Sequence, residues 1–226
     1  VLYNCSLGDQ GVISLCKNKQ WTNLKALNLV RNVIGVLGIA ELSHNSPWKN
    51  LEELDLSWNK IEVEGARKLR DNTSWTKLTK LSLSSNPLKD TAVATLATNK
   101  SWVNLQHLSL SHCSINIKGV EGLGKNSSWK NLQSLDLSSN SIRDKGIQKF
   151  RENTTWTNLK KLDLSSNEIS DTGARELSEN MFWVNLEELS LNNNNHLNEE
   201  GKDALRSTPN RPKMKKLSFA SFYSWS

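Results

Sequence analysis

The sequence has little cysteine, proline, phenylalanine or tyrosine, and it has no long apolar run. Three cysteines in 226 residues are too few for a disulfide framework. No run of 18 apolar residues occurs, so we expect no membrane-spanning helix and no membrane partner. With only four Phe and two Tyr, the nine tryptophans stand out and call for a structural explanation.

The net charge of +6 is unevenly distributed. Residues 204–226 contain five basic residues and no acidic one, namely Arg206, Arg211, Lys213, Lys215 and Lys216. These cations are followed by Phe219, Phe222, Tyr223 and Trp225, a composition that can hold phosphate and stack bases. Leu217 and Phe219, however, fit a last strand. We therefore interpret this segment as a solvated edge that closes the fold, and we do not expect a nucleic-acid partner.

Seven of the tryptophans recur every 27 residues. A Leu follows each after three residues, a Leu-x-Leu pair comes next, and an Asn closes six of the seven runs. The tryptophans are Trp21, Trp48, Trp75, Trp102, Trp129, Trp156 and Trp183, and the closing residues are Asn32, Asn59, Asn86, Cys113, Asn140, Asn167 and Asn194. A period kept over seven copies indicates a repeat protein.

Each repeat changes its apolar period once. The Leu-x-Leu pair alternates at two residues, which predicts a strand with both Leu side chains on one face. After the Asn, steps of four residues join an apolar residue, a small residue and a Leu, as in Ile34, Gly38 and Leu42. This spacing predicts a helix whose small residue allows close packing, and other helices carry an N-cap or first-turn acid at Asp90, Asp144 and Asp171.

The pattern L-x-x-L-x-L-x-x-N-x-I-x-x-x-G covers nearly the whole chain and resembles the leucine-rich repeat. Its helical half is similar to the ribonuclease-inhibitor-like subclass. The resemblance implies an α/β fold, a curved solenoid with a parallel sheet on its concave side and helices on its convex side. We expect one domain over residues 1–226 with about eight repeats. We also expect a truncated first repeat, a one-residue insertion within 192–197, and a terminal cap formed by residues 204–226.

An Asn precedes each repeated Trp by three residues, as in Asn72 and Trp75. Asn tolerates the left-handed conformation that ends helices, so we predict that it caps the helix. We predict that Trp fills the corner between the helix end and the next strand and stacks on the Trp of the adjacent repeats. Five asparagines also match the N-glycosylation motif, namely Asn4, Asn72, Asn99, Asn126 and Asn153. Asn45 and Asn180 keep the Asn–Trp pair without the motif, which favours the structural role.

The Asn at the end of each strand predicts a buried ladder of side-chain amides that bridge the backbone of adjacent repeats. Cys113 replaces one of these asparagines, and Cys5 occupies the same position four repeats earlier. Four strand spacings separate them by about 19 Å, which excludes a disulfide between them. We expect both to be reduced, buried thiols.

The residues beside and between the Leu pair should form rows on the concave face, with serines after them. Trp58 is the exception among these small residues, and it should lie exposed near Arg31, Glu53 and Asp55, a composition typical of an interface hot spot. The alternative is an indole that lies flat on its neighbours. The candidate partner-binding residues are Arg31, Glu53, Asp55, Trp58, Lys80, His107, His112, Asp136, Lys161, Asp163 and Glu188.

Asp136 and Asp163 should lie about 5 Å apart on adjacent strands, a spacing that suits acid–base chemistry or a cation. We expect Lys161 to neutralise this pair, which makes ordinary surface charge the favoured interpretation. His107 and His112 are separated by about 16 Å of strand and cannot share a metal ion. The sequence contains no phosphate-binding loop and no Ser/His/Asp signature. We therefore predict no catalytic residue, no metal and no cofactor.

These features favour a non-enzymatic scaffold that binds a protein partner on the concave sheet, with a sensor-like or effector-like role. The resemblance leaves two alternatives open: a GTPase-activating regulator that uses Arg31 or Arg143, and a repeat segment of a larger protein whose activity lies elsewhere. We expect a monomer, and the cytoplasm as its compartment because disulfides are absent. The glycosylation motifs leave a secreted effector open.

Overall fold

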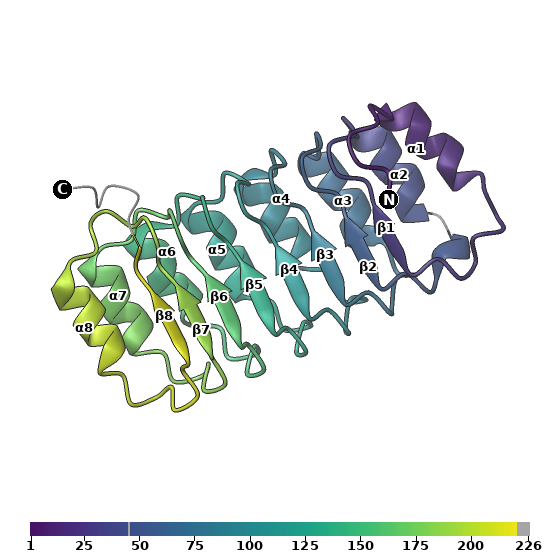
Figure 1. The fold of residues 1–226 in the computed structure, drawn as a ribbon. Coiled ribbons are helices and arrows are strands. Elements are labelled where there is room, and N and C mark those ends of the chain that lie inside the picture. The colour runs from purple at the N-terminus through teal and green to yellow at the C-terminus, as the bar shows by residue number, and fades with distance from the viewer. Residues whose placement is uncertain (45, 221–226) are drawn as a thin grey trace.

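Strands and helices alternate along a curved solenoid in the computed structural model, which describes residues 1–44 and 46–220 (Figure 1). The helices are α1 (Gly8–Cys16), α2 (Val36–His44), α3 (Val63–Asp71), α4 (Lys89–Leu96), α5 (Ile117–Gly124), α6 (Arg143–Phe150), α7 (Asp171–Ser178) and α8 (Glu199–Arg206). The strands are β1 (Ala26–Asn28), β2 (Glu53–Asp55), β3 (Lys80–Ser82), β4 (His107–Ser109), β5 (Ser134–Asp136), β6 (Lys161–Asp163), β7 (Glu188–Ser190) and β8 (Lys216–Ser218). A short 3₁₀ turn, η1 (Ser46–Trp48), precedes β2.

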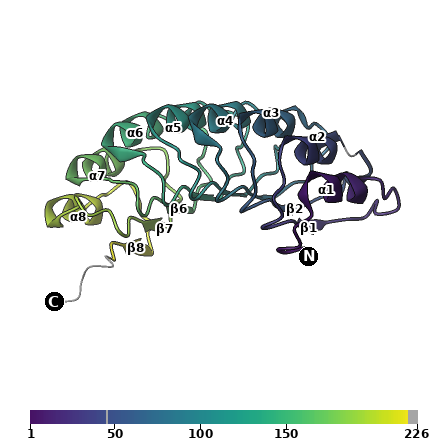
Figure 2. The same ribbon diagram turned by 90° about the horizontal axis from the view of Figure 1, so that it is seen from above.

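The eight strands form one parallel sheet in chain order. Leu27 pairs with Leu54 and Leu54 with Leu81, one repeat period apart. The last step, from Leu189 to Leu217, is one residue longer and absorbs the predicted insertion. Figure 2 shows the helices on the outer, convex side and the sheet on the inner, concave side. The predicted α/β solenoid is confirmed.

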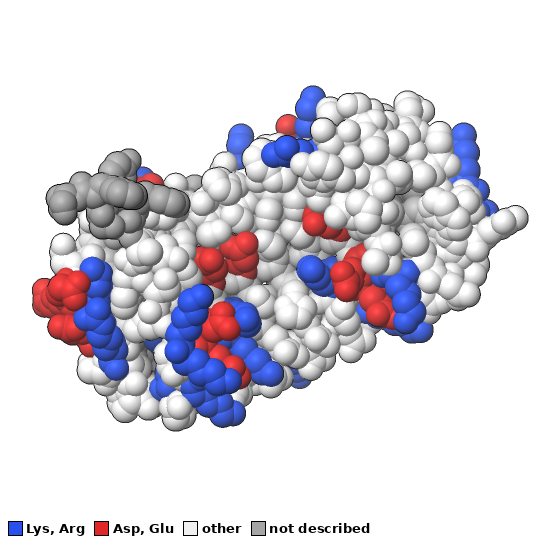
Figure 3. Space-filling view, in the orientation of Figure 1, with Lys and Arg blue, Asp and Glu red and all other residues white. Residues whose placement is uncertain are grey.

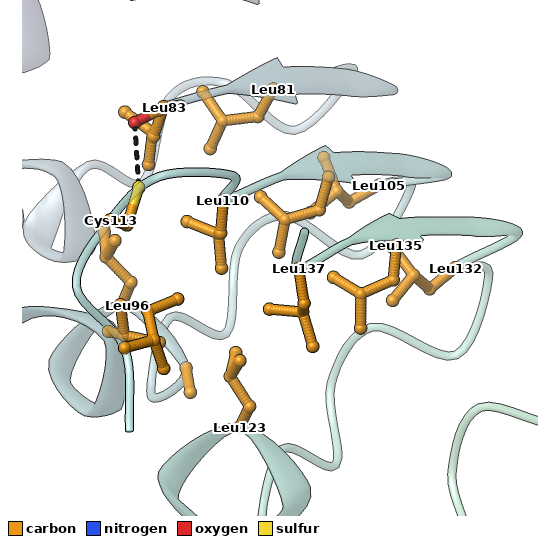
Figure 4. Packing of buried hydrophobic residues seen from close by; sticks show 14 of the residues in the cluster. Leu81, Leu83, Leu96, Leu105, Leu110, Cys113, Leu123, Leu132, Leu135 and Leu137 are labelled. Carbon is orange, nitrogen blue, oxygen red and sulfur yellow. Dashed lines mark hydrogen bonds between the residues drawn. The ribbon is translucent and has the colours of Figure 1, made fainter. Parts of the chain in front are cut away.

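The core lies between the sheet and the helices. In a typical repeat the middle Leu of the strand and the Leu two positions later are both buried, as Leu54 and Leu56 are. The helix supplies a further buried residue, such as Leu69. Figure 4 shows this packing around Leu110, Leu123 and Leu137. Each fully buried Leu contributes roughly 1.5–3 kcal/mol, so every repeat adds a similar increment of apolar stabilisation.

The first-turn aspartates bond to the next repeat rather than capping their own helix. Asp144 Oδ1 accepts a hydrogen bond from the Ser170 amide at 2.9 Å. The same oxygen lies 2.5 Å from the position that a Cβ atom on Gly173 would occupy, so a larger residue there would displace the carboxylate from this bond. Asp9, Asp90 and Asp171 stand in the same relation to Gly38, Gly119 and Gly201. The first-turn position is confirmed, and an N-cap role for these acids is wrong.

The strand-end asparagines form the predicted amide ladder. Asn140 is buried, and its Oδ1 accepts from the amides of Cys113 at 3.1 Å and Ile115 at 2.9 Å in the preceding repeat. Its Nδ2 donates to the carbonyls of Leu110 at 3.0 Å and Leu137 at 2.8 Å. One side chain thus ties two repeats together through their backbones. Asn59 and Asn194 make the same set of bonds.

The two cysteines at this position differ from each other. Cys113 is buried, and its Sγ donates to the Leu83 carbonyl at 3.3 Å (Figure 4). Burial raises the pKa of this thiol to about 12. Cys5 is exposed, so the prediction of a buried Cys5 is wrong. A strand-end residue is covered by the repeat before it, and Cys5 lies in the first repeat. Cys5, Cys16 and Cys113 are thiols in this structure.

The asparagine before each Trp caps the helix by a route that differs from the predicted left-handed turn. Asn72 has an extended backbone, with φ −66° and ψ 122°. Its Oδ1 accepts from the Trp75 amide at 3.1 Å, and its Nδ2 donates to the Ser43 carbonyl of the preceding repeat at 2.6 Å. Asn99, Asn126, Asn153 and Asn180 make equivalent bonds. Asn45 falls outside the described residues.

This bonding supports the structural role over glycosylation. The side chains of Asn72, Asn99, Asn126 and Asn153 are between 1% and 3% exposed. A glycan is attached to Nδ2, and that atom is buried and bonded in these residues. The folded chain therefore does not accommodate a glycan at these four positions.

Six of the seven repeated tryptophans, from Trp48 to Trp183, are buried, whereas Trp21 is 41% exposed. Indoles stack between Trp21 and Trp48, and between Trp102 and Trp129. Phe150 instead makes edge contacts with Trp156 and Trp183. The prediction that the indoles fill the corners holds for the six buried ones, but a continuous stack is wrong because the stacking is interrupted within the described residues.

The next position of the Trp series, in the last repeat, is Arg211. The side chain is 5% exposed, and its guanidinium donates to the Leu177 carbonyl at the end of α7. Burial lowers the pKa of Arg211 to about 10. The interpretation of this segment as a solvated edge is therefore wrong for Arg211. Leu217 and Phe219 pack against the core as predicted, while Phe222, Tyr223 and Trp225 lie outside the described residues.

We predict that Asn140→Ala lowers the free energy of unfolding by about 3 kcal/mol, because it leaves two buried backbone amides without an acceptor. Urea unfolding followed by circular dichroism measures the change. The matched control is Asn131→Ala, which removes one exposed hydrogen bond to the Val103 carbonyl. This control should lose less than about 1 kcal/mol. Equal losses in the two variants would contradict a stabilising role for the ladder.

We also predict that one thiol reacts quickly with a disulfide reagent at pH 8 in the native protein, and three react in denaturant. Cys5 is exposed, whereas Cys16 and Cys113 are buried. At a pKa of about 12, roughly one Cys113 side chain in 10,000 is ionised at pH 8. Fast reaction of all three thiols in the native state would show that the core opens readily.

Candidate protein-binding surface

Two rows of side chains line the concave face, on either side of the buried middle Leu of each strand. The first row is Ala26, Glu53, Lys80, His107, Ser134, Lys161 and Glu188, and the second is Asn28, Asp55, Ser82, Ser109, Asp136, Asp163 and Ser190. Parallel pairing in register places consecutive members side by side. Figure 3 shows this face, with charged side chains in separate clusters between uncharged areas. The candidate residues of both rows therefore share one surface.

The serines of this face are bonded to one another and to the aspartates. Ser57 Oγ lies 2.7 Å from Asp55 Oδ1 and 2.6 Å from Ser82 Oγ. Similar hydroxyl pairs join Ser84 to Ser109 and Ser165 to Ser190. These contacts join serine hydroxyls to each other and to a carboxylate.

Asp136 and Asp163 are direct partners in the sheet, as predicted. Asp136 accepts hydrogen bonds from the amide and hydroxyl of Ser138 and from the Ser109 hydroxyl. Lys161 does not neutralise this pair: its Nζ lies 2.7 Å from Glu188 Oε1. The prediction for Lys161 is therefore wrong, because the neighbouring Glu188 in its own row offers an ion pair along the face.

A shallow depression of about 390 Å³ lies over the C-terminal half of the sheet. Its lining includes Asp136, Asp163, Lys161, Glu188 and Lys216. It is polar and open, unlike the mostly apolar pockets that bury small molecules. Among residues 1–44 and 46–220, no group of three His, Cys, Asp or Glu side chains is arranged to hold a metal ion.

His107 lies on β4, and His112 lies in the turn after it. His107 pairs with Lys80 in register on the concave face. Partial burial lowers the pKa of His107, Lys80 and Lys161 lower it further, and Glu53 opposes them. His107 is therefore held in its neutral form to a lower pH than an isolated histidine.

Trp58 and Arg31 stand next to each other, one repeat apart, in the turns that follow β2 and β1. The indole is 53% exposed, and the Arg31 guanidinium carbon lies 4.5 Å from its ring centroid. Both residues have positive φ, at 59° and 57°. The predicted exposure of Trp58 beside Arg31 is confirmed. Glu53 and Asp55 belong to the preceding strand, where Asp55 bonds to Ser57.

Three exposed apolar side chains near this pair are absent from the sequence prediction. Val33 is 48% exposed, Val36 40% and Leu37 59%. An exposed apolar residue is ordinary when it stands alone, and a cluster of them is what requires explanation. A comparison of positions 27 residues apart would have found Val33 and Leu37, since polar residues occupy most of the equivalent positions.

Comparison with known proteins supports the repeat assignment. A family model described as "Leucine Rich repeat" matches residues 22–43, 49–69, 76–97, 130–150 and 157–178. A second model, "Leucine Rich Repeat", matches residues 104–126, so the two together cover more than half of the chain. None of the curated proteins matches the chain.

One similar solved structure is the crystal structure of an internalin C2 from Listeria monocytogenes. It is 22% identical, and the alignment covers 96% of this chain and 92% of the internalin with a TM-score of 0.59. At this level of identity the similarity concerns the fold. No described helix is long and apolar enough to cross a membrane.

We predict that the ring of His107 titrates below the ordinary histidine value of 6.5. NMR measurement of the ring shifts should show the midpoint rise in Lys80→Ala and fall further in Glu53→Gln. Because the lowered pKa belongs to the folded state, the associated stability is present above pH 6.5 and is lost as pH falls through the lowered value. Lys118→Ala, on α5, is the control that should leave the midpoint unchanged. A midpoint at or above 6.5 would contradict this electrostatic picture.

Proposed function

The chain belongs to the leucine-rich repeat proteins, and from that premise we propose that it is a non-enzymatic scaffold that binds a protein partner on its concave sheet. The observation that carries the proposal is the exposed Trp58 with the Arg31 guanidinium over its ring. Trp and Arg are the residues most enriched in interface hot spots. Here they lie next to strands whose serines bond to one another.

The two concave rows extend the proposed surface beyond this pair. Glu53 and Asp55 lie on β2, close in sequence to Trp58, and Lys80 lies on the neighbouring strand β3. The other candidates lie further along the sheet and its turns: His107, His112, Asp136, Lys161, Asp163 and Glu188. Charges on such an open surface contribute mainly to the rate and specificity of association, so we assign most of the affinity to Trp58 and Arg31.

We further propose a sensor-like or effector-like role and a place in the ribonuclease-inhibitor-like subclass. The subclass assignment is supported by the α-helix on the convex side of each repeat. The thiol state of the cysteines supports the cytoplasm over secretion, with a secreted effector as the alternative. We propose a single domain that acts as a monomer.

The competing functions receive less support from the geometry. A GTPase-activating role needs an available arginine, but Arg143 pairs with Glu168 at 2.9 Å, which leaves Arg31 as the one of the two candidates without an ion pair among the described residues. A nucleic-acid role needs free C-terminal cations, but Lys215 pairs with Glu187 and Arg211 is buried. A repeat segment of a larger protein remains compatible with the proposed surface.

Affinity capture from lysate tests the proposal, with mass spectrometry as the readout. We predict that the native chain captures a defined protein and that the double variant Trp58→Ala, Arg31→Ala loses it. Loss of two hot-spot side chains should weaken binding by about a hundredfold or more.

Lys118→Ala, on α5, is the matched control and should capture the same protein as the native chain. Circular dichroism must show that all three proteins are folded. Equal capture by the native chain and the double variant would remove Trp58 and Arg31 from the site. Absence of any specific partner would favour a segment of a larger protein whose activity lies elsewhere.

A further inference from the structure

Trp58 and three other exposed apolar side chains belong to two consecutive repeats at the N-terminal end of the sheet. We call the group formed by Arg31, Val33, Val36, Leu37, Trp58 and Lys60 the rim patch. Its four apolar members are between 40% and 59% exposed. They come from two consecutive turns and the first two residues of α2. The patch therefore lies at the rim of the sheet and reaches the start of a helix.

The other repeats provide an internal control for this patch. The equivalents of Trp58 are Asn4, Arg31, Ser85, His112, Ser139, Ser166 and Asn193. The equivalents of Val33 are Ser6, Lys60, Pro87, Ser114, Ser141, Glu168 and Asn195. The equivalents of Leu37 are Gln10, Glu64, Thr91, Lys118, Lys145, Thr172 and Glu200. The repeat architecture thus accepts polar residues at these positions and does not require apolar ones.

Two contacts connect the two repeats of the patch. The Arg31 guanidinium lies over the Trp58 ring, and the Lys60 amide donates to the Ile34 carbonyl at 2.9 Å, which places Lys60 beside Val33. Val33 and Trp58 both have positive φ, near 58°. This conformation is uncommon for any non-glycine residue and is an outlier for a β-branched one. Local backbone preference therefore does not explain these two residues.

Both cations of the patch lack an acidic partner among the described residues. Arg67, Arg70, Arg143, Arg151, Arg175 and Arg206 each form an ion pair with Asp or Glu, and Arg211 donates to a carbonyl. Within residues 1–44 and 46–220, the Arg31 guanidinium lies over the Trp58 ring without an ion pair, and Lys60 makes no ion pair. The nearby Glu62 pairs with neither of them in this part of the chain. An unpaired arginine against an indole is arranged to receive a carboxylate.

We infer that the rim patch binds a peptide segment of the partner in which an aliphatic or aromatic side chain lies next to an Asp or Glu. The apolar side chain would cover Trp58 and Val33 while the carboxylate pairs with Arg31. The inference rests on the proposed function, and it specifies the chemistry of the partner at one end of the concave face.

Selection of a random peptide library displayed on phage, with the immobilised native chain as bait, tests this inference. Enriched peptides should combine apolar residues with Asp or Glu. A synthetic copy of the leading peptide should bind about tenfold more weakly to Trp58→Ser and to Arg31→Ser, because each removes one hot-spot contact. Selection on Arg31→Glu should instead enrich Lys or Arg.

These substitutions introduce the serine that the chain itself carries at positions 85, 139 and 166 of the same row. Lys145→Thr, in the row of Leu37 four repeats further on, is the matched control, since Thr91 and Thr172 occupy the same row, and it should bind the peptide like the native chain. Melting temperatures of all variants confirm that the fold is intact.

The inference is overturned if the enriched peptides lack acidic residues, or if both rim variants bind them normally. It is also overturned if no peptide is enriched, or if sedimentation shows a dimer that Trp58→Ser dissociates, because a second copy would then cover the patch. Its failure differs from failure of the proposed function. If a captured protein is lost with Lys80→Ser and Lys161→Ser but retained by the rim variants, the concave scaffold stands and the rim inference fails.

Discussion

The buried carboxamide of the asparagine that follows most strands is the interaction on which the rest of the structure depends. Asn140 satisfies two amides of the preceding repeat and carbonyls of both repeats. A buried amide without a partner costs about 1–3 kcal/mol, so a repeat that slipped in register would lose several such bonds together. The constant 27-residue step, the in-register sheet and the rows on its concave face all follow from this requirement.

A surface generated in this way is regular, and most of it is satisfied internally. The serine hydroxyls bond to each other and to Asp136, and Lys161 bonds to Glu188. Such groups gain little by exchanging these bonds for bonds to a partner. Affinity should therefore come from positions whose residues depart from the repeat pattern. On the described surface the clearest departures are the exposed apolar residues Trp58, Val33 and Leu37.

The period of the sequence was sufficient to predict the fold, the strand-end ladder and the exposure of Trp58 next to Arg31, because residues 27 apart become neighbours. The period does not predict which of several neighbouring groups a side chain bonds to. Asn72 favours a left-handed turn locally, but its amide bonds to Ser43 from the preceding repeat. The sequence predicts a solvated cation at Arg211, but the side chain is buried at the position that Trp occupies in the other repeats.

In this account the regular repeat positions stabilise the fold, and the rim patch binds the partner without contributing to stability. Urea unfolding of the combined variant Arg31→Ser, Val33→Ser, Leu37→Lys and Trp58→Ser, built from residues that other repeats carry, tests it most directly. We predict a free energy of unfolding within about 1 kcal/mol of the native chain, as for ordinary surface substitutions. A loss of about 3 kcal/mol or more, the size seen for core defects, would show that the patch is structural and contradict the claim.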